Sequence, residues 1–233
     1  MSSRHGDVTR ASKGPGPASA RRSSYRSLAS LQRDCRTCRA CALAGFPIRS
    51  GPVFEGAPGQ LAMLVGQAPG AVEGAEGRPW RGRAGATLRR WLELDETAFS
   101  ATFYCTSVTR CYPGRSPGGR GDRTPAAREI DLCRVWLDRE LALLRPRLVV
   151  TVGGLAARAL LDVVRLTPAV GRVHALGEAV AIPLPHPSGA SGWLNDPTNR
   201  RRLTTALALV EAHLAELPPP RPPVAGSGSR RRP

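Results

Sequence analysis

Short apolar runs alternate with longer amphipathic stretches through the middle of the chain. Four runs have the length and composition of buried strands, at 61–65 (LAMLV), 103–108, 148–152 (LVVTV) and 179–184 (AVAIPL). Helical spacing follows each of them, at 84–94, 124–144, 155–163 and 197–217. Repeated strand, loop and helix predict an α/β layered domain with a mostly parallel four-stranded sheet. The proline in the last run indicates an edge strand, or one that ends early.

The two ends of the chain differ from its middle. Residues 1–34 are rich in Ser, Gly, Pro and Arg, and we expect a disordered basic segment there. Residues 218–233 are rich in Pro and Gly and end in three arginines, which predicts a disordered basic tail. The folded domain is therefore expected to span residues 35–217.

The chain is strongly basic, with a formal net charge of +16. Such an excess favours a polyanionic partner, most simply DNA or another nucleic acid. The plainer alternative is solubility combined with the arginine bias of a GC-rich genome. No apolar run approaches the roughly 20 residues of a membrane-spanning helix, and no signal peptide is evident. We expect a soluble protein of the bacterial cytoplasm, associated with the nucleoid.

Six cysteines are present in a chain that we expect to be cytoplasmic, so disulfides are the less favoured use. Cys35, Cys38 and Cys41 form two overlapping C-x2-C pairs, while Cys111 follows a predicted strand and Cys133 lies in a predicted helix. Four thiolates from these places could hold a zinc ion or an iron–sulfur cluster, and spacing does not choose between them. Burial as a free thiol is the alternative, and it suits Cys105, inside an apolar strand.

Two loops at strand ends carry the other unusual residues. The loop 66–70 (GQAPG) follows the first strand, where glycines let backbone N–H groups approach a ligand. His186 stands between two prolines after the last strand, a rigid setting for a hydrogen bond to a developing oxyanion. Ligands bind at the carboxyl ends of parallel strands. A lone histidine is nevertheless more often structural.

Taken together, the motifs of this chain resemble those of the iron–sulfur uracil-DNA glycosylases of families 4 and 5. They are VGQAPG, the glutamate that follows it, GRPW, TSVTRC, the downstream Cys133 and HPSGAS. The resemblance spans about residues 38–199. It implies a three-layer α/β/α fold, excision of uracil from single- or double-stranded DNA in base excision repair, and a monomer. It also implies a [4Fe-4S] cluster on Cys38, Cys41, Cys111 and Cys133, with Cys35 as an alternative to Cys41.

The same resemblance assigns roles to the residues around the two loops. The implied base-binding residues are Gly66, Gln67, Ala68, Trp80 and Ser107. His186 would stabilise the oxygen of the departing base. Glu73 would position or deprotonate the attacking water, with an ion pair to an arginine as its plainer alternative.

Three positions depart from the family pattern. Gln67 replaces the glutamate of the GEAPG motif, Gly74 replaces an aspartate, and Ser107 replaces an asparagine that reads uracil. Trp80 keeps an aromatic platform where the family has a phenylalanine. These departures leave two alternatives open: a glycosylase for another lesion, such as a deaminated purine, or a catalytically inactive iron–sulfur DNA-binding protein of the same fold.

Further residues are expected to meet DNA. Trp193 or Leu194 would enter the duplex as a wedge, unless the two simply pack onto the last helix. Ser188, Arg200 and the insertion 114–123 (GRSPGGRGDR) would contact the backbone without sequence preference. Lys13, the single lysine, lies in the N-terminal segment, so no amine is available for strand cleavage through a Schiff base. The activity should be monofunctional.

Overall fold

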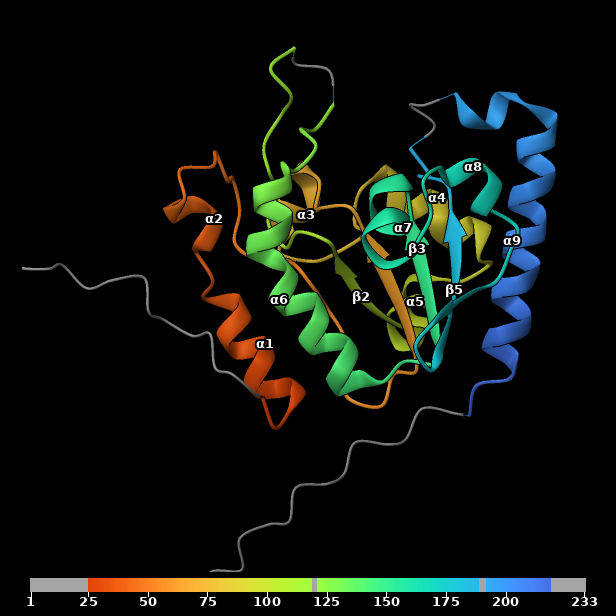
Figure 1. Cartoon of the computed structure of the whole chain (residues 1–233), viewed down its shortest axis with the longest axis horizontal. Coiled ribbons are helices and arrows are strands. Elements are labelled where there is room, and N and C mark those ends of the chain that lie inside the picture. Colours follow the sequence, from red (N-terminus) through yellow and green to blue (C-terminus); the bar gives the residue numbers. More distant parts are fainter. Residues whose placement is uncertain (1–24, 119–120, 189–191, 219–233) are drawn as a thin grey trace, which may run out of the picture.

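The computed structural model describes residues 25–118, 121–188 and 192–218. Its centre is a five-stranded sheet in the order β2-β1-β3-β5-β4, with helices on both faces (Figure 1). The strands are β1 Ala62–Gly66, β2 Phe103–Ser107, β3 Leu148–Val152, β4 His174–Leu176 and β5 Ala179–Leu184. Only the short β4 is antiparallel to its neighbour. The α/β class is confirmed, with one strand more than expected.

The helices form the two outer layers. They are α1 Leu28–Arg36, α2 Ala40–Leu43, α3 Ala71–Glu76, α4 Arg83–Trp91, α5 Glu96–Thr102, α6 Ala127–Leu144, α7 Gly154–Leu160, α8 Leu166–Ala169, the 3-10 helix η1 Trp193–Asn195 and α9 Pro197–Ala215. Figure 1 shows α1 and α6 on one side of the sheet and α9 on the other. Among the described residues, no helix has the length and apolar character needed to cross a membrane.

Alternation along the strands creates two cores. In β1, Met63 and Val65 pack with α1 and α6, whereas Ala62 and Leu64 pack on the opposite face with α4 and α9. Successive side chains of a strand point to opposite faces, so a fully apolar strand supplies both cores. This is why β1, β2 and β3 are buried along their whole length.

Two expectations need correction. Strand β5 is not the edge of the sheet, because β4 pairs with it over residues 179–181. Pro183 lies beyond that pairing, so its missing N–H costs no bond to β4. The ordered domain also begins before residue 35: α1 buries Leu28 and Leu31 in the core. The remaining segments expected to be disordered, 1–24 and 219–233, lie outside the described residues.

Candidate active site

The predicted base-binding residues of β1 and β2 lie side by side at the carboxyl edge of the sheet. Gly66 pairs in register with Ser107, and the Val108 N–H donates to the Gly66 carbonyl at 2.9 Å. One residue on, the N–H of Thr109 donates to the carbonyl of Gln67 at 3.1 Å. These backbone bonds fix the first loop against the end of β2.

Trp80 packs across this edge. A Cβ at Gly66 would lie 3.1 Å from the Trp80 ring, so the glycine leaves room for the indole. The Trp80 backbone is left-handed, with φ of 59°, and its carbonyl accepts a hydrogen bond from Arg89 at 2.8 Å. A Cβ at Gly85 would lie only 1.8 Å from that carbonyl oxygen. Trp80 is thus held in place by its neighbours, and stacking on a flipped base stays a prediction.

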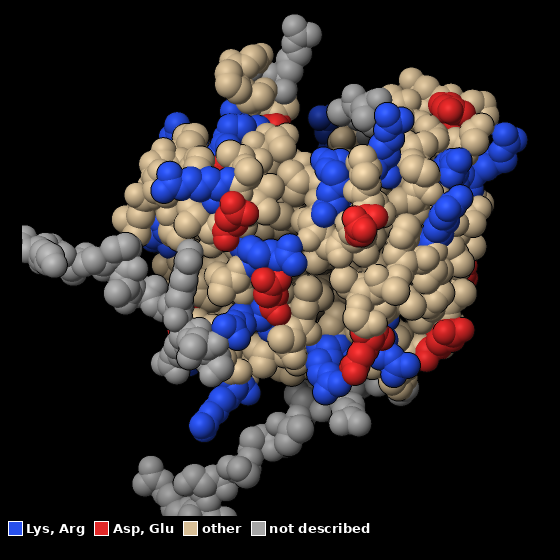
Figure 2. Space-filling model, in the orientation of Figure 1, with Lys and Arg blue, Asp and Glu red and all other residues tan. Residues whose placement is uncertain are grey.

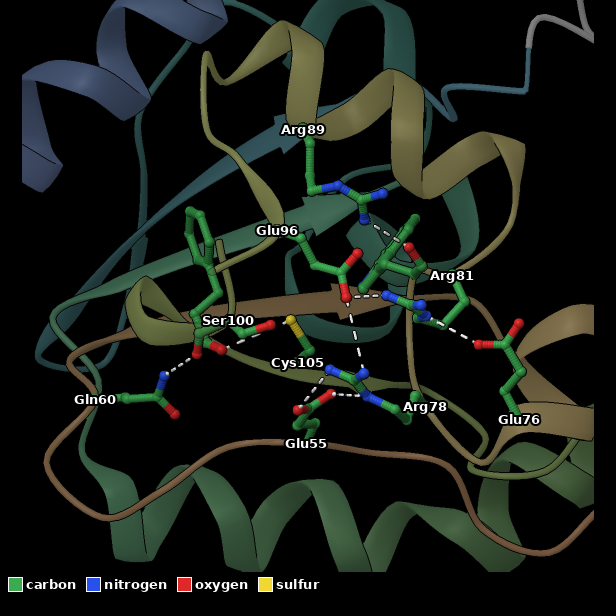
Figure 3. Close-up of polar contacts among 11 residues, drawn as sticks. Glu55, Gln60, Glu76, Arg78, Arg81, Arg89, Glu96, Ser100 and Cys105 are labelled. Carbon is green, nitrogen blue, oxygen red and sulfur yellow. Dashed lines mark hydrogen bonds and ion pairs between the residues drawn. The ribbon is translucent and has the colours of Figure 1, made fainter. Parts of the chain in front are cut away.

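An exposed ion-pair network surrounds the loop that carries Trp80 (Figure 3). Arg81 pairs with Glu76 at 2.9 Å and also with Glu96. Arg78 pairs with Glu55 at 3.3 Å and with Glu96 at 3.7 Å. Single exposed pairs contribute little to stability, whereas a network restrains the segments it joins. Here it joins the α3–α4 loop to the start of α5 and to the segment before β1.

His186 follows β5 and lies beside the turn after β3. A Cβ at Gly153 would be 3.7 Å from the His186 side chain. The Ser188 N–H donates to Nδ1 of His186 at 3.3 Å, and the Ser188 hydroxyl lies 2.9 Å from the same atom. A backbone N–H can only donate, so the neutral ring carries its proton on Nε2. This partnership is a role for Ser188 that sequence reasoning missed, and its contact with DNA stays a prediction.

The surroundings of His186 favour the neutral ring. Although the residue is partly open to solvent, the protein atoms around it remove water from the imidazolium, and this lowers the His186 pKa below its usual value. The carboxylates of Glu73 and Asp122 oppose that shift. At neutral pH the ring is therefore a neutral donor facing two acids.

Glu73 lies in α3 with one carboxylate oxygen fixed. Its Oε1 accepts the Gly82 N–H at 2.9 Å. Its Oε2 lies 2.7 Å from the position that a Cβ at Gly70 would occupy. Within the described ranges, no arginine lies at ion-pair distance from Glu73, so the plainer alternative of an ion pair is not what these residues form.

Asp122 is a residue that sequence reasoning missed. It belongs to the 114–123 insertion, which was expected only to contact phosphates, yet its Oδ2 lies 3.3 Å from the same Cβ position at Gly70. The Tyr112 hydroxyl donates to its Oδ1 at 3.0 Å. The sequence feature that could have indicated it is that Asp122 is the single acid in an otherwise basic and neutral stretch.

The expected wedge residues pack onto the protein. Trp193 and Leu194 are half-buried against the α9 core, and the Trp193 indole N–H donates to Thr167 at 2.9 Å. Arg200 is exposed, and its guanidinium donates to the carbonyls of Leu194 and Asn195 at 2.8 and 3.0 Å. This arrangement matches the packing alternative, and contact of these residues with DNA stays a prediction. The loop residues 189–191 lie outside the described residues.

A cavity lies between α2, the end of β2 and α6. It has a volume of about 480 Å³, and its lining includes the four predicted cluster ligands Cys38, Cys41, Cys111 and Cys133. Cys35 does not line it and is buried in the α1–α6 core. Burial and the neighbouring cysteines raise the pKa of Cys111 to about 12, so a positive centre is needed to favour its thiolate.

The four cysteines that line the cavity have the thiol chemistry that an iron–sulfur cluster requires. In the described part of the chain, no three His, Cys, Asp or Glu side chains form a group that could hold a metal ion. Cys105 lies away from this cavity, inside β2, as expected for a buried free thiol.

A buried arginine connects the cysteine-lined cavity to the end of β2. The Arg110 N–H donates to the Cys133 sulfur at 3.3 Å, and its guanidinium donates to the Ser107 carbonyl. The guanidinium also pairs with Glu140 at 2.5 Å, where both side chains are 1% exposed. Burial raises the pKa of Glu140, and the Arg110 charge opposes that rise. The buried pair therefore braces both regions.

Parallel α/β domains bind their ligands at the carboxyl edge of the sheet. Here that edge carries loops, a neutral histidine and two carboxylates, which is the arrangement of a ligand-binding or hydrolytic protein. Residues 54–208 match the model of the uracil DNA glycosylase superfamily. The chain belongs to this superfamily. The matched segment contains every predicted base-binding residue, His186, Cys111 and Cys133, and it begins after Cys38 and Cys41.

Curated relatives agree with this assignment. A type-4 uracil-DNA glycosylase of Sulfurisphaera tokodaii is 32% identical over 127 residues, 54% of each chain. A type-4 enzyme of Pyrobaculum aerophilum is 31% identical over 135 residues, 58% of this chain and 65% of the relative. A type-5 uracil-DNA glycosylase of the same organism is 32% identical over 172 residues, 66% of this chain and 71% of the relative. The chain thus spans between about half and two thirds of the type-4 relatives.

Proposed function

We propose that the protein is a monofunctional uracil-DNA glycosylase, which hydrolyses the N-glycosidic bond of uracil in DNA as a monomer in the cytoplasm. The observation that carries the proposal is the neutral His186, which carries its proton on Nε2 and is close enough to the Glu73 carboxylate for that charge to act on its pKa. The names of the relatives support uracil as the base. Figure 2 supports DNA as the partner, since arginine side chains are spread widely over the face it views.

The residues divide the chemistry between the base and the sugar. The target nucleotide leaves the duplex, and its base lies against Trp80 and the 66–68 loop. As the C1′–N1 bond breaks, its electron pair moves to the base, where the Nε2–H of His186 stabilises the oxyanion. The free oxygen of Glu73 holds a water and takes its proton as the water oxygen bonds to C1′. Free base and an abasic site result.

We also propose that Cys38, Cys41, Cys111 and Cys133 hold a [4Fe-4S] cluster, with Cys35 left as a core thiol. The support is the shared cavity, which these four residues line and Cys35 does not. When bound, such a cluster ties α2, the end of β2 and α6 together without entering the base chemistry. The residues it would brace include Ser107, through Arg110.

A single-turnover assay with enzyme in excess tests the proposed function. Oligonucleotides carrying uracil, hypoxanthine, xanthine or no lesion are treated with alkali after reaction to reveal abasic sites. We expect release of uracil, and about a hundredfold or greater loss in His186→Ala. The matched control is His213→Ala, because His213 lies on α9 and, among the described residues, bonds only the Leu209 carbonyl of its own helix. Release of hypoxanthine or xanthine alone would replace uracil as the substrate, and no release at all would favour the inactive DNA-binding alternative.

A further inference from the structure

The insertion 114–123 places the carboxylate of Asp122 beside Gly70. A loop that only bound phosphates would not be expected to carry an acid there. DNA presents a dense negative charge, and acidic groups facing it weaken binding. Asp122 nevertheless turns its carboxylate toward Gly70, beside the Oε2 of Glu73, and the two acids together act on His186. A carboxylate in this position lowers the affinity for DNA. A role in the reaction would explain why the acid is nevertheless present.

The structure fixes Asp122 rather than leaving it on a loose tip. The Arg123 N–H donates to the Gly114 carbonyl at 2.8 Å, and residues 115 and 122 form an antiparallel bridge. The Arg123 guanidinium pairs with the buried Glu129 in the first turn of α6 at 2.6 Å. With the Tyr112 hydroxyl on its Oδ1, the Asp122 side chain keeps Oδ2 directed at the space beside Gly70.

Gly70 keeps that space open. A Cβ there would meet Glu73 Oε2 at 2.7 Å and Asp122 Oδ2 at 3.3 Å, so the two oxygens flank a gap that any side chain would fill. The other oxygen of each acid already accepts a protein hydrogen bond, from Gly82 and Tyr112 respectively. Two directed acceptors across a small gap are suited to hold one water molecule between them.

We propose that Asp122 is a second carboxylate of the active site, which acts with Glu73 on the attacking water and on the positively charged sugar. This inference rests on the proposed glycosylase function and goes beyond it by adding a residue. As the C1′–N1 bond breaks with its electrons moving to the base, the sugar becomes cationic. The water oxygen then bonds to C1′ while one proton passes to a carboxylate of the pair, and the second carboxylate keeps the site negative.

Asp122 could instead serve only to anchor the insertion through its bond to Tyr112. The two roles separate experimentally, because Tyr112→Phe removes the hydrogen bond and keeps the charge, whereas Asp122→Asn removes the charge and keeps an acceptor for the Tyr112 hydroxyl. Asp122→Glu restores the charge at a slightly different reach. Asp131→Asn is the matched control, since Asp131 is an exposed acid on α6 away from the site.

The experiment measures the single-turnover rate on a uracil-containing duplex and the affinity for the same duplex carrying thymine. We expect Asp122→Asn to lower the rate about 10- to 100-fold, less than loss of a sole base would. Its affinity should stay equal or increase, because a negative charge near phosphate is lost. Asp122→Glu should recover part of the rate, Tyr112→Phe should lose far less than Asp122→Asn, and Asp131→Asn should match the wild type.

The contrary outcomes are distinct. An active wild type with an unchanged Asp122→Asn rate would overturn the role of Asp122 and leave the proposed function intact. Equal losses in Tyr112→Phe and Asp122→Asn would reduce Asp122 to an anchor of the insertion. A wild type that releases no uracil would overturn the proposed function, and the role of Asp122 with it.

Discussion

The loops at the strand ends and the cysteine-lined cavity are built by different means. In the loops, the polypeptide itself holds the polar groups: the Gly82 N–H donates to Glu73, and the Ser188 N–H sets the tautomer of His186. In the cavity, burial raises the pKa of Cys111 and Cys133, so their reactive thiolate forms are disfavoured. The first region is therefore preorganised by the fold, whereas the thiolates of the second would need a positive centre, which the proposed cluster would supply.

Arg110 and Glu140 join these two regions through the interior. The pair lies between β2 and α6. The Arg110 guanidinium donates to the Ser107 carbonyl, and the backbone N–H of the same residue donates to the Cys133 sulfur. Damage at the cysteines should therefore reach the base-binding strand, while damage at His186 or Glu73 should leave the cavity unchanged. We expect the following variants to show whether the two regions differ in this way.

Serine in place of Cys38, Cys41, Cys111 or Cys133 should have the largest effect. Each change removes a thiolate from a four-ligand set, so we expect loss of bound iron and of the visible absorption of the purified protein. Iron content and the absorption spectrum are the measurements. Cys35→Ala and Cys105→Ala should keep the iron, and full iron retention in Cys41→Ser with loss in Cys35→Ala would contradict the assignment of Cys41.

Arg110→Met should strongly destabilise the fold. It leaves the Glu140 carboxylate buried without its cation, which typically costs about 3–5 kcal/mol. The measurement is the denaturant midpoint of the iron-loaded protein. Arg134→Met, which breaks an exposed pair with Asp138 on the same helix, is the control and should change little. Similar midpoints for both variants would contradict a structural role for the buried pair.

Gly70→Ala should reduce catalysis while leaving the fold intact. The backbone there has φ of −83°, which alanine adopts readily, but its methyl group would lie 2.7 Å from Glu73 Oε2. Displacing a reacting group by such a contact can lower the rate by roughly 10- to 100-fold. The single-turnover rate and the thermal midpoint are measured together. Wild-type activity in this variant would show that the attacking water is not held in the gap beside Gly70.

The smallest effect concerns pH. Burial lowers the His186 pKa, so the neutral donor persists into mildly acid solution and activity should fall only below the usual histidine range near 6.5. The carboxylates of Glu73 and Asp122 raise this pKa, so Asp122→Asn should move the acid limb to still lower pH. The check is the rate profile of both proteins. A limb that moves upward in the variant would contradict this electrostatic account.

The sequence predicts four of the five strands and misses β4. Strands β1, β2 and β3 are continuous apolar runs buried on both faces, and such runs are recognisable in one dimension. Strand β4 has only three residues and no pattern of its own, so it was missed, and β5 was placed at the edge instead. Helix α1 was missed because its apolar positions follow a polar, arginine-rich segment.

The parts of the candidate site that lie within one sequence motif can be predicted from the sequence. The parts formed where distant segments meet cannot. The loops around Gly66 and His186 stand at strand ends, and parallel strands bring such ends together. Asp122 lies more than fifty residues from Gly70 in the sequence, and only the fold of the insertion brings its carboxylate there. Likewise, spacing alone does not tell that Cys41 of α2 lines the cavity and that Cys35 of α1 does not, which is why Cys41 is the ligand proposed here.

Identification of the products from uracil-containing DNA shows whether the protein hydrolyses the N-glycosidic bond of uracil with His186 as the donor. The iron-loaded protein is incubated in excess with a labelled oligonucleotide, and free base and strand integrity are measured together. The account predicts free uracil in equal amount to abasic sites, with strands intact until alkali is added, and neither product from His186→Ala above about one hundredth of the wild-type rate. Strand breaks without alkali, or uracil release that is unaffected in His186→Ala, would contradict it.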